Sequence, residues 1–315
     1  MPEQQGQRWK LVLAFAVVYI VWGSTYLGIR YAITSIPPLL MAGVRFVIAG
    51  MLLFAWAQFR GGFKWPKLIH WRSAAILGLL MLLGGNGGVT LAEKHIPSGM
   101  AALLVTTEPL WLVLLSWGKR GGTAPTRLEM AGLLLGLGGV VLLVAPSHAS
   151  GASLLGAALV LVSAFTWAAG SIYSTTAETP APIISNGIIM LCGGVFLALA
   201  GLLRGEWQQV HIAGITPTSA AALLYLSLFG SIAAFSAYTY LLAHTTPAKA
   251  STYAFVNPVV AVLLGWFFAG EPLTSRSLAA MCAIVLAVAL LIVKHHPPRQ
   301  TAAEEPKESG DAIAA

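Results

Sequence analysis

Ten apolar segments constrain the fold of this chain more than any other feature of its sequence. A transmembrane helix needs roughly 20 consecutive, predominantly apolar residues. Only 9% of the residues are charged, against about 25% in soluble domains, so the chain cannot cover a large water-facing surface. The sequence therefore predicts an all-α polytopic membrane protein with ten transmembrane helices. The expected spans are Leu11–Ile29, Leu39–Phe59, Ser73–Ala92, Pro97–Gly118, Met130–Pro146, Ala152–Tyr173, Ile183–Leu203, Thr218–Leu242, Ala250–Gly270 and Leu278–Val293.

The basic residues between these segments predict how the chain is oriented. Most of the 18 lysines and arginines lie in the N-terminal segment 1–10, in the loops around 60–72 and 119–127, and in the C-terminal segment 294–315. Because loops rich in Lys and Arg stay in the cytoplasm, we expect both termini to be cytoplasmic. The polar tail 294–315 is expected to be disordered. The net charge of +7 is spread over loops, so we expect no nucleic-acid partner.

The fourth and ninth expected spans resemble each other in sequence. The fourth contains IPSGMAALLVTTEPLWLVLL and the ninth contains TTPAKASTYAFVNPVVAVLLG. Pro97 corresponds to Pro247, and a second proline follows each of them at nearly the same interval. Near the start of each half, WGSTY at Trp22 has a fainter counterpart in WAAGSIY at Trp167. These matches indicate an internal repeat, although two segments rich in Leu, Ala and Val also resemble each other by composition alone.

The repeat divides the chain into two halves, 11–146 and 152–293, with five expected spans each. Five is odd, so the second half must enter the membrane in the opposite orientation to the first. Inverted-topology repeats of this kind are typical of secondary transporters, whose substrate site lies between the halves near the membrane midplane. The sequence therefore predicts two inverted five-helix repeats with a site between them.

Three stretches of sequence form recognisable motifs: NPVVAVLLGWFFAGEPLT from Asn257, WGSTYLGIRYAITSIPPLLMAGVRF from Trp22 and GNGGVTLAEKHIPSGMAALL from Gly85. They resemble the EamA-type drug/metabolite transporter family, and most of all its YedA-like bacterial inner-membrane subgroup. The resemblance implies an inner-membrane protein of ten helices, with an internal five-helix repeat and a central cavity of alternating access. It also implies export of amino acids, metabolites or toxic compounds. The first half departs from the family pattern, because its WGKRGGTAPT loop has no counterpart of Gly270–Glu271.

Two charged residues lie well inside expected spans, where a charge is costly and usually functional. Arg45 follows Pro37 by eight residues and Glu108 follows Pro97 by eleven, which places them about 12 and 16 Å deep at about 1.5 Å per residue. As a pair they would neutralise each other and fix the packing of two helices. On a cavity, Arg45 would bind a substrate carboxylate and Glu108 would bind and release a proton.

Neutral polar and aromatic residues at similar depths complete the candidate substrate site. Asn86 sits in GGNGG, where the glycines allow either close helix packing or a break in the helix. Asn257 precedes Pro258, which either kinks the helix or leaves a carbonyl free for a ligand. Trp167 is a weaker candidate, because aromatic residues are common at membrane interfaces. The expected substrate-binding residues are Trp22, Ser24, Tyr26, Arg45, Asn86, Glu108, Ser236, Tyr238, Tyr253 and Asn257.

Three further charged residues are expected near the outer ends of spans. Glu93 and Lys94 fall in a short loop between the third and fourth spans, and we expect both to be solvated. Glu271 follows the ninth span, and we expect it to mark a helix start or the membrane interface before any role as a gate.

Function follows from these features and from the motifs that the sequence lacks. It has no His and Cys cluster with metal-ligand spacing and no phosphate-binding G-x-x-x-x-G-K-[ST] loop, so we expect no cofactor, no metal and no enzymatic activity. We predict a secondary active exporter of small amino-acid-like metabolites or xenobiotics. Its partners would be a small-molecule substrate, the lipid bilayer, protons as a candidate coupling ion, and a second copy in a homodimer. The alternatives are an importer or exchanger of another solute class, and a membrane-embedded enzyme or scaffold.

Overall fold

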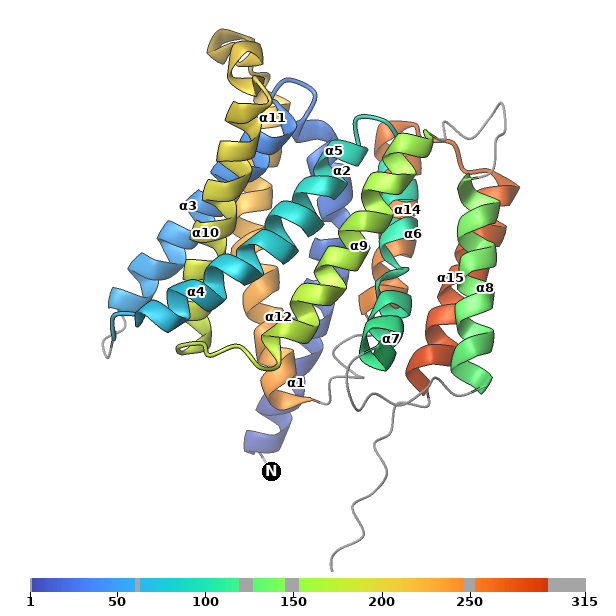
Figure 1. Cartoon of the computed structure of the whole chain (residues 1–315), viewed down its shortest axis with the longest axis horizontal. Helices are drawn as coiled ribbons and strands as arrows, with labels where there is room; N and C mark the ends of the chain where they lie inside the picture. Colours follow the sequence, from blue (N-terminus) through green and yellow to red (C-terminus); the bar gives the residue numbers. More distant parts are fainter. Residues whose placement is uncertain (1, 60–62, 119–126, 145–152, 246–252, 294–315) are drawn as a thin grey trace, which may run out of the picture.

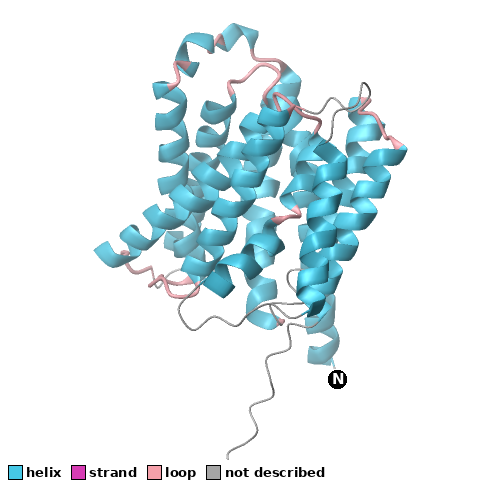
Figure 2. Ribbon diagram, turned by 45° about the vertical axis from the view of Figure 1, so that its right-hand side comes forward, coloured by secondary structure: helices cyan, strands magenta, loops and turns pink. Residues whose placement is uncertain are grey.

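The computed structural model describes residues 2–59, 63–118, 127–144, 153–245 and 253–293, and this part of the chain is helical with no strand (Figures 1 and 2). The expected tail 294–315 lies outside the described residues. The helices are α1 Pro2–Val17, α2 Gly23–Ala32, α3 Pro38–Phe59, α4 Leu68–Leu77, α5 Gly88–Ala92, α6 Ser98–Val105, α7 Glu108–Gly118, α8 Arg127–Val144, α9 Leu154–Ser174, α10 Pro182–Leu203, α11 Pro217–Tyr225, α12 Ala234–His244, α14 Tyr253–Ala269 and α15 Ser275–Val293. The π-helical segments η1 Val18–Trp22, η2 Gly78–Gly87 and η5 Leu226–Ala233, and the short 3-10 segments η3 Glu206–Gln209 and η4 Ile212–Gly214, complete the order.

Helices occupy the positions of all ten expected spans, but their described lengths differ. Within the described residues, seven helices are long and apolar enough to cross a membrane. The apolar parts of the other three, Met130–Gly139, Val256–Ala269 and Ser275–Ala287, are shorter. These three fall on the fifth, ninth and tenth expected spans.

Three of the spans change from α- to π-helical geometry in their middle. These are the first, third and eighth spans, which contain η1, η2 and η5. In η2 the glycines of GGNGG allow close packing, because a Cβ on Gly84 would lie 2.7 Å from Thr166 Oγ1 and one on Gly85 would lie 2.8 Å from Trp167 Cε3. The third span is therefore widened and packed tightly against α9 without a break. Such π-helical segments are frequent at functional sites.

The fourth span is interrupted at Thr106–Thr107, between α6 and α7. Pro109 explains the position of the interruption, because a proline has no N–H and its ring clashes with the carbonyl four residues earlier. That residue is Val105, where α6 ends. The hydroxyl of Thr107 donates to the Leu104 carbonyl (2.7 Å), which adds a local bond that competes with regular helix.

Equivalent helices of the two halves pack against each other in three places: α3 with α10, α6 with α14, and α8 with α15. Glu206, just after α10, accepts hydrogen bonds from the backbone N–H groups of Leu39 and Leu40 near the start of α3, each at 3.0 Å. Glu271, just after α14, accepts from the N–H of Ser98 at the start of α6 (2.8 Å). In these two pairs one helix therefore ends where its counterpart begins, so the two helices run in opposite directions.

Further hydrogen bonds join the connecting segments at the end of the molecule where these caps lie. The segments at this end are residues 33–37, 93–97, 204–216 and 270–274. Tyr31 donates to the carbonyl of Phe268 (2.7 Å), and the hydroxyls of Thr34 and Ser219 lie 2.8 Å apart. We call this the capped end, because carboxylates cap two of the helices that begin here, α3 and α6. In the orientation predicted from the sequence it faces the outside.

Candidate functional site

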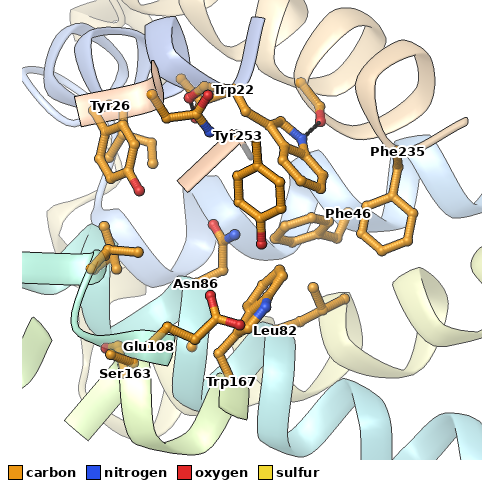
Figure 3. Close-up of a pocket in the computed structure, with 18 of the residues that line it drawn as sticks. Trp22, Tyr26, Phe46, Leu82, Asn86, Glu108, Ser163, Trp167, Phe235 and Tyr253 are labelled. Carbon is orange, nitrogen blue, oxygen red and sulfur yellow. Dashed lines mark hydrogen bonds between the residues drawn. The ribbon is translucent and has the colours of Figure 1, made fainter. Parts of the chain in front are cut away.

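A cavity of about 820 Å³, counting all space free of protein atoms, lies between the two halves. Its walls come from the first, second, third, fourth, sixth, eighth and ninth spans. Figure 3 shows side chains from these separate helices pointing into one space, with Asn86, Glu108 and Tyr253 near its centre. The cavity thus lies between the two halves, as expected for a site built by a repeat.

Seven of the ten expected substrate-binding residues line this cavity and three do not. Ser24 bonds instead to the carbonyl of Val21 (2.8 Å) and to the hydroxyl of Tyr225 (2.5 Å). Ser236 is exposed, and Tyr238 packs against the ring of Trp22. The lining residues are Trp22, Tyr26, Arg45, Asn86, Glu108, Tyr253 and Asn257.

An aromatic cluster around Trp22 forms one wall. The rings of Tyr238 and Tyr253 each lie 5.1 Å from the Trp22 ring, within the range of favourable aromatic pairs. The indole Nε1 donates a hydrogen bond to the carbonyl of Gly230 in η5 (3.2 Å). These contacts hold Trp22, which belongs to the first span, against the eighth and ninth spans of the second half. Part of its surface faces the cavity.

Arg45 is 4% exposed and lies on the cavity wall formed by the second span. Its Nε donates to the hydroxyl of Ser231 (2.9 Å), and its guanidinium carbon lies 4.7 Å from the centre of the Phe46 ring. These contacts orient the guanidinium group from two helices. Arg45 and Glu108 both line the cavity, so the two side chains border the same space.

Glu108 begins α7, directly after the interruption of the fourth span. The N-terminus of a helix favours a negative charge, and half-helix ends of this kind form substrate and ion sites in transporters. Tyr26 and Tyr253 on the facing helices line the same cavity as Glu108. Its carboxylate therefore supplies the cavity with an acceptor held at a defined position.

Two asparagines add further acceptors to the cavity. Within the described part of the chain, the side-chain oxygens of Asn86 and Asn257 are buried without a hydrogen-bond partner, which is costly unless a ligand or water satisfies them. Pro258 lies inside α14. The backbone carbonyl of Asn257 lies 3.2 Å from the place where a Cβ on Gly23 would be, so this carbonyl packs against the first span.

Other lining residues were missed or ranked low in the sequence. Trp167 lines the cavity, and its place in WAAGSIY, the counterpart of WGSTY at Trp22, was the signal that could have found it. Each repeat thus supplies a tryptophan to the lining of the cavity. The remaining side chains missed include Thr25, Phe46, Ser163 and Phe235, which carry no pattern that separates them from helix-packing residues.

Two sequence expectations near the capped end are changed by the structure. The prediction that Glu93 is solvated was wrong, because its side chain is 0% exposed, whereas Lys94 is exposed as expected. Glu271 does not cap the helix that follows it and instead caps α6 of the other half. Within the described residues, no group of three or more His, Cys, Asp or Glu side chains is placed to hold a metal ion.

Comparisons with known proteins agree with this architecture. The chain is 43% identical over 280 residues to the uncharacterized inner membrane transporter YedA of Escherichia coli K12, covering 88% of this chain and 89% of that one. It is 28% identical over 300 residues to the uncharacterized transporter YvbV of Bacillus subtilis 168, covering 93% and 94%. A crystal structure with 22% sequence identity has the same fold, with a TM-score of 0.61 over 90% of this chain and 96% of the other.

The sequence model of the EamA-like transporter family matches twice, at residues 9–145 and 154–293. The two matches account for the repeat and for nearly all of the described helices. With its apolar helices and its inner-membrane relative, the chain is a multi-pass transporter of the inner membrane. This protein belongs to the EamA-like transporter family.

Proposed function

We propose that this protein is a secondary active transporter that exports small amino-acid-like metabolites or xenobiotics by alternating access. The observation that carries the proposal is the cavity between the two repeats, which is lined by charged, amide and aromatic groups. Ionisable residues inside a membrane protein are costly and usually mark a substrate or ion pathway. Two inverted repeats around such a site are the usual architecture of secondary transporters.

The composition of the cavity supports an amphipathic substrate. Glu108 and the oxygens of Asn86 and Asn257 offer acceptors to an ammonium or amide group. Arg45 offers a cation to a carboxylate, although its Nε is already bonded to Ser231. The aromatic rings that line the same space suit an apolar or aromatic body, and they attract cations over their faces. An amino-acid-like molecule or an organic amine satisfies these groups together.

In an alternating-access cycle, the hydrogen bonds of the capped end would hold that side of the cavity closed. Those between α2 and the second half, such as Tyr31 to Phe268, must break for the cavity to open there. With the capped end facing outside, closure keeps the cavity shut off from the exterior while substrate binds from the cytoplasm. Protons bound at Glu108, or the gradient of the substrate itself, would drive the cycle.

Flux measurements in liposomes test this function. Protein reconstituted in one orientation would be given labelled amino acids and cationic dyes, with and without a pH gradient. We expect export of at least one compound, and a loss of most of that flux in Trp22→Ala. The matched control is Trp117→Ala, because Trp117 is 47% exposed and does not line the cavity.

The other outcomes separate the alternatives. Accumulation in the opposite direction would identify an importer. Equal flux from Trp22→Ala and wild-type protein would remove the cavity from the transport path. An absence of flux for every compound, with correctly oriented and folded protein, would contradict a carrier.

A further inference from the structure

Glu93 is a buried carboxylic acid that lies outside the lining of the cavity. It is the first residue after α5, at the capped end, and neither of its carboxylate oxygens has a hydrogen-bond partner in the described part of the chain. Its backbone N–H donates to the carbonyl of Val89 (3.0 Å), and Val89 lines the cavity. Glu93 therefore lies one helical turn from the cavity, toward the capped end.

Several elements bring charged or titratable groups close to Glu93. Arg30 of α2 donates a hydrogen bond from Nη1 to the backbone carbonyl of Glu93 (2.8 Å), so this cation is attached to the residue but not to its carboxyl group. The other groups are Arg45 of α3, Glu271 before α15, Tyr26 of α2, and the exposed Lys94 and His95 of its own loop. The α9 helix also packs against α5, but its titratable residue, Tyr173, lies near its opposite end.

An ionised carboxylate in this position would lack both water and hydrogen bonds. The cost of burying such an ion is several kcal/mol even after the protein relaxes, and buried groups usually become neutral instead. Burial raises the pKa of Glu93 well above its ordinary value, and the charge of Glu271 raises it further. Arg30 and Arg45 offset only part of this effect. The neutral acid is thus the form that fits a closed capped end.

We propose that Glu93 is a proton-binding site that must be occupied for the capped end to close. When this end opens, the side chain meets water, and the carboxyl group transfers its proton to a water molecule. The carboxylate left behind is free to form an ion pair with Arg30, which the backbone hydrogen bond already holds nearby. The inference rests on the proposed function in one respect: the transporter would exchange this proton during its cycle.

The direction of the pH effect follows from the pKa of Glu93 in the two states. It is raised in the closed state and lies near the ordinary glutamate value of about 4.3 in the open state, where water solvates the group. Below the ordinary value both states carry the proton, so closure does not depend on pH. Between the two values, each unit of rising pH shifts the ratio of closed to open by about tenfold toward open.

Hydrogen–deuterium exchange of the full chain in lipid nanodiscs tests the proposal without a substrate. The reporters are the backbone N–H groups of Ser98 and Gly99, which are bonded to Glu271 in this structure. We expect these bonds to break when the capped end opens. After correction for the intrinsic pH dependence of exchange, we expect their exchange in wild-type protein to increase as the pH rises. In Glu93→Gln, which carries no titratable group here, we expect protection to stay high at every pH.

Two matched variants make the outcome specific. Glu178→Gln makes the same chemical change at an exposed residue and is expected to keep the wild-type pH dependence. Glu108→Gln makes it in the cavity and tests the rival proton site. The proposal is overturned if Glu93→Gln keeps that dependence, or if Glu108→Gln alone removes it. Since the readout is closure and not flux, a failure here is distinct from a failure to transport any compound.

Infrared spectroscopy provides a second measurement in case Glu93→Gln does not fold. A carboxyl group that remains protonated at neutral pH gives a C=O stretching band separate from that of carboxylates. We expect such a band in wild-type protein and in Glu108→Gln at neutral pH. Its complete loss in Glu108→Gln would assign the buried proton to Glu108 and would overturn the proposal.

Discussion

The carboxylate of Glu271 accepts hydrogen bonds from the backbone N–H and the hydroxyl of Ser98, at 2.8 and 2.7 Å. It also accepts from the N–H of Gly99 at 3.0 Å. A residue at the end of the ninth span thus caps the first turn of the fourth span, which belongs to the other repeat. Glu206 stands in the same relation to the start of α3. Each cap joins a helix of one repeat to its counterpart in the other.

Removal of this cap is expected to destabilise the protein. Glu271→Ala leaves the N–H groups at the start of α6 without an acceptor, and loss of a helix cap typically costs about 0.5–2 kcal/mol. We expect a lower thermal unfolding temperature in detergent, and a similar loss for Glu206→Ala. Glu178→Ala, at an exposed position, is the control. An unfolding temperature equal to that of the control would show that the capping bonds contribute nothing to stability.

The close contact between α3 and α10 predicts a strong effect of a single methyl group. A Cβ on Gly50 would lie 2.8 Å from the carbonyl oxygen of Gly187 and 2.9 Å from the backbone nitrogen of Leu191. Because backbone atoms cannot move aside cheaply, Gly50→Ala should cost about 1–3 kcal/mol. Gly118→Ala is the control, since nothing lies within 4 Å of its added Cβ. Equal unfolding temperatures for the two variants would contradict this packing.

The acceptors of the cavity predict a preference among ligands that differ only in their head group. Phenylethylamine, phenylacetate and phenylethanol share an aromatic body and can be compared by titration calorimetry. We expect the amine to bind most tightly, because Glu108 and the free oxygens of Asn86 and Asn257 all accept hydrogen bonds. Glu108→Gln should weaken the amine by about tenfold or more, as expected for a hydrogen bond to a charged group. Tighter binding of phenylacetate would instead indicate that Arg45 leads recognition.

The hydrogen bond of Trp22 to Gly230 predicts a graded effect on the same titration. Trp22→Phe keeps an aromatic ring but removes the Nε1 donor, and a typical hydrogen bond contributes about 0.5–1.5 kcal/mol. We expect phenylethylamine to bind up to about tenfold more weakly to this variant, and more weakly still to Trp22→Ala. Trp117→Phe should bind like wild-type protein. Indistinguishable affinities for all of these proteins would place the ligand elsewhere.

Much of the candidate site was accessible from the sequence because a charge or an amide inside an apolar span is conspicuous. Arg45, Asn86, Glu108 and Asn257 stood out for this reason, and all four line the cavity. Hydroxyl and aromatic residues gave no such contrast. Ser24 was chosen and its neighbour Thr25 was not, yet Thr25 lines the cavity, since the rotation of a helix about its axis depends on its neighbours.

The sequence by itself determined that the chain is a helical membrane transporter of two repeats, because hydropathy, charge bias and internal similarity are properties of the chain read in order. The fourth span was expected as one continuous helix, and its interruption before Glu108 was found only in the structure. Only the tertiary structure decided which residues face the cavity, that Glu271 caps a helix 173 positions away, and that Glu93 is buried. These features arise from contacts between segments distant in sequence, and it is those contacts that remove a loop carboxylate from water.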